Sequence, residues 1–236
     1  MIIDFLSHTG TRKGYNYPVE ELITMMDGAG VDRAMTASQL ENIDNENTAL
    51  SVKKFPDRII GFAVENPWTM GAEEDLEHAL RDNGLKGLKL NANRFGFAAD
   101  RHSIVDPFFQ ICSRYHAAVM AHAMSDLFSI PAKWEEIARS FPDVPIVLSH
   151  MGIPMMADNA FEIAKRNKNI YLGTAVCFAP VVKRAIEEVG PEKVIFSSDA
   201  PFGSMAQEIR KIKYVTSDPG AQKLILGENA RKILNL

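Results

Sequence analysis

Four side chains that can bind a metal ion or carry a proton stand at the ends of short apolar segments in this chain of 236 residues. They are His8, His122, His150 and Asp199. Neutral imidazoles together with one carboxylate are typical of zinc sites, with manganese and iron as alternatives. A metal ion held in this way lowers the pKa of a bound water and makes hydroxide available near neutral pH. The four residues therefore predict a divalent metal, most of all zinc, and hydrolytic chemistry.

Each of these residues also has a purely structural interpretation. A single histidine at a strand end is often a hydrogen-bonded structural residue, and Asp199 stands where it could cap the next helix. The coincidence of four such residues at four segment ends favours a functional site. The remaining histidines are expected to have surface or capping roles: His78 in a charged helix, His102 in a loop and His116 at a helix end.

Eight short apolar runs alternate with longer amphipathic stretches along the chain. The runs cover Met1–Leu6, Arg33–Ala37, Ile59–Val64, Leu85–Leu90, Ala117–His122, Pro145–His150, Asn169–Val176 and Lys193–Ser198. Nearly continuous hydrophobicity is typical of strands buried on both faces, as in a parallel sheet. Helices are expected over Val19–Asp27, Ala72–Arg81, Ala132–Arg139, Ala157–Lys165, Ala179–Glu188 and Ser204–Tyr214, with one or two more within Ala221–Leu234.

This alternation predicts the α/β class, and within it a distorted (β/α)8 TIM barrel that forms a single domain over residues 1–236. Eight strand–helix units in 236 residues come close to the usual size of such a barrel. The competing architecture is an open doubly wound sheet, but no glycine-rich GxGxxG turn occurs in the chain. A barrel carries its active site at the carboxyl ends of its strands, which is where the four polar residues fall.

Composition limits the classes of partner. The formal net charge of −4 gives no basic footprint for nucleic acid or an anionic membrane surface. Cys112 and Cys177 lack metal-binding spacing and fit a reducing compartment, and the opening residues lack the pattern of a signal peptide. We expect a cytoplasmic enzyme with a small-molecule substrate. Short loops after the strands predict a mouth that is open or is completed by the second subunit of a homodimer.

Six segments, in order along the whole chain, carry a resemblance to a known family. They are Met1–Asp4 followed by His8, Gly84–Leu90, Val119–His122, Ile146–Gly152, Ile195–Phe202 and Ile225–Leu234. Together they resemble the amidohydrolase superfamily, and more narrowly its amidohydrolase-related (type 2) group, which includes aminocarboxymuconate-semialdehyde decarboxylase. The resemblance implies a metal-dependent TIM-barrel hydrolase.

The resemblance also implies a role for each residue. His8, His122 and Asp199 would ligate the metal, and Asp199 would accept a proton from the metal-bound water. His150 would be a catalytic acid or base, or would orient the substrate or the water. One departure matters, because the first histidine of the family motif falls on Leu6 here. Three protein ligands are still sufficient for a catalytic zinc, but the affinity for metal should be lower.

Further candidates lie near the same strand ends. Lys89 could anchor a substrate carboxylate or the metal environment, or form a salt bridge at the barrel rim. The resemblance adds a further alternative for Lys89, because in relatives with two metals a carbamylated lysine at this strand bridges them. Arg94 could clamp a substrate carboxylate or be a solvated loop residue. Asp4 could support a ligand or cap a helix. Aromatic residues that could line an apolar pocket are Phe95, Phe97 and Phe178.

The sequence leaves three functions open. The first is a metal-dependent hydrolase of an ester, lactone or amide. The second is a nonoxidative decarboxylase of a small carboxylic acid on the same scaffold, which a cluster of arginines around a substrate carboxylate would favour. The third is a barrel that binds a ligand without catalysis, which Leu6 favours because it removes a metal ligand.

Overall fold

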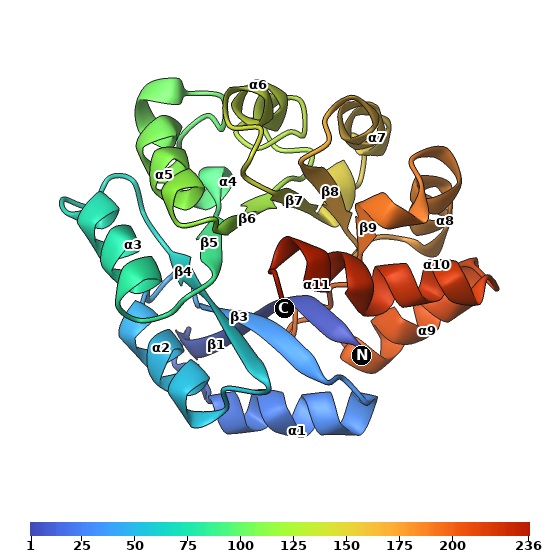
Figure 1. The fold of residues 1–236 in the computed structure, drawn as a ribbon, viewed down its shortest axis with the longest axis horizontal. Helices are drawn as coiled ribbons and strands as arrows, with labels where there is room; N and C mark the ends of the chain where they lie inside the picture. Colours follow the sequence, from blue (N-terminus) through green and yellow to red (C-terminus); the bar gives the residue numbers. More distant parts are fainter.

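A curled, mainly parallel sheet surrounded by helices forms the protein, and the computed structural model describes all 236 residues (Figure 1). The strands are β1 (Ile3–Arg12), β2 (Tyr15–Tyr17), β3 (Arg33–Ser38), β4 (Ile59–Val64), β5 (Gly87–Leu90), β6 (Ala118–His122), β7 (Ile146–Ser149), β8 (Ile170–Gly173) and β9 (Val194–Ile195). Their order is β2-β1-β3-β4-β5-β6-β7-β8-β9, and only the β1–β2 pair is antiparallel. The predicted α/β barrel is confirmed.

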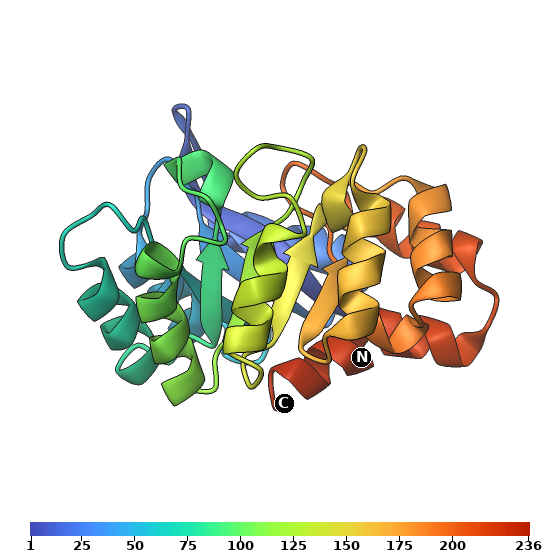
Figure 2. The ribbon, with the colours of Figure 1, turned by 90° about the horizontal axis from the view of Figure 1, so that it is seen from above.

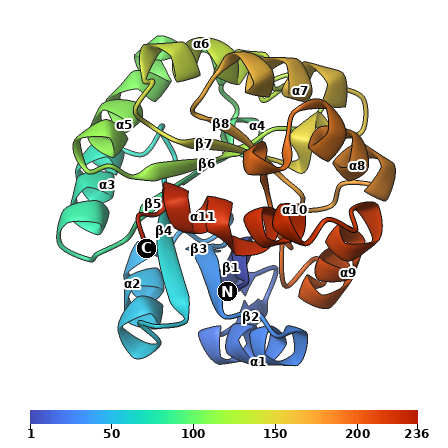
Figure 3. The same cartoon turned by 45° about the vertical axis from the view of Figure 1, so that its right-hand side comes forward.

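Helices cover the outer face of the sheet (Figures 2 and 3). They are α1 (Val19–Ala29), α2 (Asn45–Lys54), α3 (Ala72–Arg81), α4 (Ala92–Phe95), α5 (His102–Arg114), α6 (Lys133–Ser140), α7 (Ala157–Arg166), α8 (Ala179–Glu188), α9 (Met205–Val215), α10 (Pro219–Lys223) and α11 (Asn229–Ile233), with short helical turns η1 (His150–Gly152), η2 (Pro191–Lys193) and η3 (Leu224–Glu228). None of the helices has the length and apolar character that crossing a bilayer requires.

The barrel closes between β1 and the segment that follows β9. The backbone N–H of Asp199 donates to the carbonyl of Leu6 over 2.8 Å, and the N–H of His8 donates to the carbonyl of Ala200 over 2.8 Å. The pairing of β1 with β3 shifts register between Asp4 and Ser7, which is the local distortion of the barrel. Closure therefore places His8 beside Asp199, although 191 residues separate them in the chain.

Apolar side chains form an inner layer within the barrel and an outer layer beneath the helices. The inner layer includes Phe5, Leu6, Met35, Phe62, Met120, Val147 and Ile195. Helix α11 adds Ala230 and Ile233 to the same layer, and the preceding turn η3 lies against the carbonyl of Met1. The C-terminal helix thus covers the amino ends of the strands and leaves their carboxyl ends open.

Several elements differ from the sequence-based prediction. Helices α2, α4 and α5 were not predicted, and His102 begins α5 instead of lying in a loop, with Nδ1 2.8 Å from Asp106. Strand β1 was expected to follow the apolar run Met1–Leu6 and to end at His8, but it runs on to Arg12. The two-residue turn Lys13-Gly14 explains this, because both residues have positive φ and such turns connect tightly twisted hairpins. The β1–β2 hairpin projects above the barrel rim (Figure 2).

Gly87 provides a test of how tightly the barrel is packed. A Cβ at this position would overlap with the carbonyl oxygen of Ala118 and with the ring of Phe62. We expect Gly87→Ala to lower the free energy of unfolding by about 1–3 kcal/mol, measured by urea denaturation. Gly28→Ala is the matched control, because Gly28 is helical with open space around it and alanine should be neutral or stabilising there. Equal losses in the two variants would contradict the packing argument.

Candidate active site

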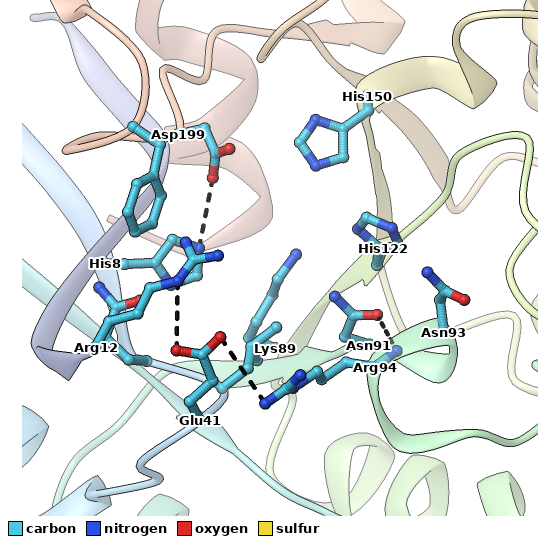
Figure 4. Close-up of a pocket in the computed structure, with 13 residues that line it drawn as sticks. His8, Arg12, Glu41, Lys89, Asn91, Asn93, Arg94, His122, His150 and Asp199 are labelled. Carbon is cyan, nitrogen blue, oxygen red and sulfur yellow. Dashed lines mark hydrogen bonds and ion pairs between the residues drawn. The ribbon is translucent and has the colours of Figure 1, made fainter. Parts of the chain in front are cut away.

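A cavity of about 300 Å³ opens at the carboxyl ends of the strands (Figure 4). Its lining is mainly polar and consists of His8, Arg12, Gln39, Leu40, Glu41, Lys89, Asn91, Asn93, Arg94, His122, His150, Asp199 and Phe202. The six predicted site residues, His8, Lys89, Arg94, His122, His150 and Asp199, all lie along this one cavity. His78, His102 and His116 do not line it, in agreement with the expectation from the sequence.

Asp199 and His8 form one side of the cavity. The Oδ1 atom of Asp199 lies 3.5 Å from Nε2 of His8. Burial acts to raise the pKa of Asp199, but contact with His8 and nearby positive charge, including that of Lys89, outweigh it and bring the pKa below its ordinary value. Asp199 is therefore an ionised carboxylate near neutral pH and is able to accept a proton.

His150 and His122 form the opposite side, with ring centroids 5.3 Å apart and ring planes at 71°. The Nδ1 atom of His150 lies 3.0 Å from the carbonyl oxygen of Ala175. Because a carbonyl can only accept, Nδ1 carries the hydrogen of this bond. Burial lowers the pKa of both His150 and His122, so both rings are neutral near pH 7. The Nε2 atom of His150 is then a free hydrogen-bond acceptor.

Lys89 rises from β5 and extends its amine between these two sides (Figure 4). Its side chain is only 2% exposed, and Nζ lies 3.4 Å from the hydroxyl of Ser149. Burial lowers the pKa of Lys89 to about 8, against the attraction of Asp199. The alternative interpretation as a rim salt bridge is wrong, since no carboxylate lies within ion-pair distance of Lys89 while the cavity surrounds it.

The predicted metal ligands His8, His122 and Asp199 do not meet around one point, as the sequence led us to expect they would. The residue types fit a divalent metal, and Nδ1 of His8 is buried without a hydrogen-bond partner. However, no three imidazole, carboxylate or thiolate groups are placed to hold one ion. Leu6 packs into the inner apolar layer and supplies no donor. In this arrangement the residues present do not form a metal site.

Asp4 supports the Asp199 segment from within the barrel. Its carboxylate accepts from the backbone N–H of Ser198 over 2.8 Å, from the hydroxyl of Ser198, and from the N–H of Leu6 over 3.2 Å. Asp199 itself does not cap the next helix, because the cap of α9 is Ser204. Asp4 therefore holds β1 against the residue before Asp199, and neither Asp4 nor Asp199 is a helix cap.

Asp4 should make stability depend on pH. Burial raises the pKa of Asp4 to about 7, above the value of about 3.9 in an unfolded chain. The folded protein then binds the proton more tightly, so the free energy of unfolding falls as pH rises from about 4 to about 7. We expect Asp4→Asn to flatten this decline, measured by urea denaturation between about pH 5 and pH 8. Curves of equal slope for the wild type and the variant would contradict this role.

Residues that sequence reasoning missed lie on the rim. Arg12 comes from the β1–β2 hairpin, and its Nε lies 3.4 Å from Glu41, which also lies 3.9 Å from Nη2 of Arg94. Gln39 is buried, and its amide nitrogen has no partner. Gln39 directly follows β3 and Glu41 comes two residues later, so the rule of polar residues at strand ends could have found them. Arg12 had no such signal, because its strand was expected to end earlier.

The aromatic prediction is also corrected. Leu40 and Phe202 line the cavity, whereas Phe95, Phe97 and Phe178 do not. The guanidinium of Arg12 stacks 4.3 Å above the centroid of the Phe202 ring. The cavity is consequently a polar pocket with one aromatic wall.

The chain is thus an α/β barrel with a polar pocket of titratable side chains at the carboxyl ends of its strands. The family model described as Amidohydrolase (Amidohydro_2) matches residues 11–236. The chain belongs to this family, and the resemblance to the amidohydrolase superfamily is confirmed. The match begins beyond the segment that contains Leu6 and His8. Among curated proteins, none matches this chain.

Several solved structures share the fold. The 5-carboxyvanillate decarboxylase of Sphingomonas paucimobilis has a TM-score of 0.79 and 16% identity, with 100% of this chain and 99% of that chain covered. A probable 2-pyrone-4,6-dicarboxylic acid hydrolase of Acinetobacter baumannii, with citric acid bound, has a TM-score of 0.77, 16% identity and 100% and 99% coverage. A 5-carboxyvanillate decarboxylase of Novosphingobium aromaticivorans contains bound manganese and has a TM-score of 0.71, 19% identity and 91% and 80% coverage.

Proposed function

We propose that this enzyme hydrolyses an ester, lactone or amide bond of a small substrate that carries a carboxylate. The observation that carries the proposal is the opposition, across one cavity, of the ionised Asp199 carboxylate and the neutral His150 ring. Such a pair can take a proton from water and return it to a leaving group. Membership of the amidohydrolase superfamily itself follows from the family match.

The side chains of the pocket can carry each step of this hydrolysis. Asp199 accepts a proton from water, and the water oxygen forms a bond to the substrate carbonyl carbon. The carbonyl electron pair moves onto its oxygen, which the ammonium of Lys89 stabilises. When the bond to the leaving group breaks, Asp199 returns the proton to the leaving oxygen or nitrogen. His150 orients the water through its free Nε2 acceptor. In these steps Lys89 and Asp199 act without a metal-bound water, because no three donor groups meet around one point.

The cationic groups that line the cavity support a substrate with a carboxylate. Arg12, Lys89 and Arg94 line the cavity, whereas its acidic residues are Glu41 and Asp199 alone. Guanidinium groups bind carboxylates in a bidentate manner that lysine and histidine cannot reproduce. The names of two structural neighbours, a dicarboxylic acid hydrolase and a carboxyvanillate decarboxylase, are consistent with this class of substrate.

Nonoxidative decarboxylation is the second candidate. The observation that favours it is the pair of arginines at the mouth, Arg12 and Arg94, both in contact with Glu41. In that reaction the bond between the carboxylate carbon and the substrate carbon breaks, and the latter takes a proton from the pocket. We also propose a cytoplasmic location, which the free thiols of Cys112 and Cys177 support. The homodimer remains a prediction from the short loops.

An activity screen tests both candidates. Purified protein is offered lactones, esters, amides and aromatic carboxylates, after chelator treatment and after addition of zinc or manganese. Release of an alcohol or amine together with an acid supports hydrolysis, and release of carbon dioxide supports the second candidate. Arg94→Met should raise KM for a carboxylate substrate by about 10- to 100-fold with kcat less affected. A pocket that binds carboxylates but converts none of these compounds would overturn both and leave the ligand-binding barrel.

A further inference from the structure

The amine of Lys89 shares one cavity with the imidazoles and the carboxylate that would have to share a metal ion. Figure 4 shows it between the His8–Asp199 pair on one side and the His122–His150 pair on the other. Lys89 is nearly fully buried, and its only hydrogen-bond partner is the neutral hydroxyl of Ser149. The positive charge is therefore directed at the pocket and is not neutralised by a direct ion pair.

The imidazoles and the carboxylate are arranged as two pairs. Asp199 is 3.5 Å from His8, while His122 packs edge-to-face on His150. A catalytic zinc needs three protein donors within about 2.0–2.2 Å of the ion. No such group of three exists in this chain. The buried side chain of Leu6 occupies the position next to His8 on the same strand from which another donor could have reached the pocket.

The positive charge of Lys89 disfavours a metal ion in this pocket, as the arrangement of the imidazoles and the carboxylate also does. A divalent cation placed between the two pairs would sit next to the ammonium of Lys89 in a buried site, where repulsion is weakly screened. Conversely, an ammonium at this point attracts the Asp199 carboxylate and any negative oxygen of a substrate. A lysine in the centre therefore supplies part of what a metal would supply, which is a fixed positive charge beside the reacting oxygen.

We propose that Lys89, in place of a divalent cation, supplies the positive charge of this site, and that the chain holds no metal ion there in its working state. What this charge does rests on the proposed function, where it stabilises a carbonyl oxygen or anchors a carboxylate. The exclusion of metal does not rest on it, because binding can be measured without a substrate.

Metal binding to four forms of the full chain tests the inference. Wild type, Lys89→Met, Leu6→His and the double variant are titrated with Zn²⁺ and with Mn²⁺ by calorimetry, and their metal content is measured after gel filtration. Methionine keeps the length and burial of Lys89 without its charge. We expect wild type to retain no stoichiometric metal, and the double variant to bind at least about 10- to 100-fold more tightly. Lys165→Met on the surface is the control and should bind as wild type does.

Two results would overturn the inference. One is a wild-type protein that retains one equivalent of zinc or manganese through gel filtration. The other is a folded Lys89→Met protein whose metal affinity equals that of wild type, since this would show that the charge excludes nothing. Should Leu6→His fail to fold, Lys89→Met alone carries the comparison. A wild type that turns over substrate while holding metal would overturn this inference and leave the proposed reaction intact. A wild type that holds no metal and turns over no substrate would leave this inference intact and overturn the proposed reaction.

Discussion

Replacing Asp199 with asparagine is expected to lower kcat by about a thousandfold or more. The Asp199 carboxylate is ionised and lines the same cavity as the neutral His150, so its loss removes the acceptor of the water proton. Asparagine has nearly the same shape. It also tolerates the left-handed backbone of this residue, whose φ is 61°. The variant therefore changes the proton acceptor and little else, and steady-state kinetics on the substrate found in the screen measure the loss.

Two measurements separate chemistry from folding in this variant. The free energy of unfolding and the Kd for a carboxylate ligand should stay close to those of wild type. Asp158→Asn is the matched control, because Asp158 is an exposed aspartate that pairs with Arg184 and does not line the cavity, and kcat of this variant should not change. If Asp199→Asn kept more than about a tenth of wild-type kcat, another group would be the base and the assignment of Asp199 would be wrong.

Replacing Trp134 with alanine is expected to lower the free energy of unfolding by about 3–5 kcal/mol, the largest stability effect that we predict. Trp134 lies on α6 and is fully buried in the outer apolar layer. Its indole N–H also donates to the backbone carbonyl of His122 over 3.2 Å. Alanine leaves a cavity and an unpaired carbonyl behind a site residue, so both stability and the position of His122 should change. Urea denaturation measures the first effect.

Two further variants show which part of Trp134 matters. Trp134→Phe keeps most of the apolar volume and loses the hydrogen bond, so a cost of about 1–2 kcal/mol is expected. The other tryptophan, Trp68, is 56% exposed and donates to the carbonyl of Phe95 over 2.6 Å. Trp68→Ala should cost no more than about 1 kcal/mol. A loss for Trp68→Ala as large as that for Trp134→Ala would contradict the burial argument.

Much of this site could be predicted from the sequence because parallel strands buried on both faces leave few polar positions. A polar residue directly after an apolar run, such as His122 or Asp199, is then conspicuous. The same reasoning placed Lys89 and His150 at the correct edge of the sheet. The helices were found where a clear apolar stripe existed, as in α3 and α8, whose predicted bounds are those of the structure.

Other features of the site depend on contacts between distant parts of the chain. Asp4 holds Ser198, 194 residues away, only because the barrel closes between β1 and the end of β9. Arg12 reaches the cavity because the turn after it folds β1 back as a hairpin. The spacing of apolar residues along the sequence gives no indication of contacts between such distant residues.

The amino-acid sequence by itself determined the class of fold, the edge of the sheet that carries the site and the types of side chain gathered there, because burial along each strand dictates which positions are apolar. Only the tertiary structure decided how those side chains are grouped. It places His8 with Asp199, His122 with His150, and the amine of Lys89 between the two pairs. The physical reason is that ligand chemistry depends on distances of a few ångströms, which strand register, barrel closure and side-chain packing set together.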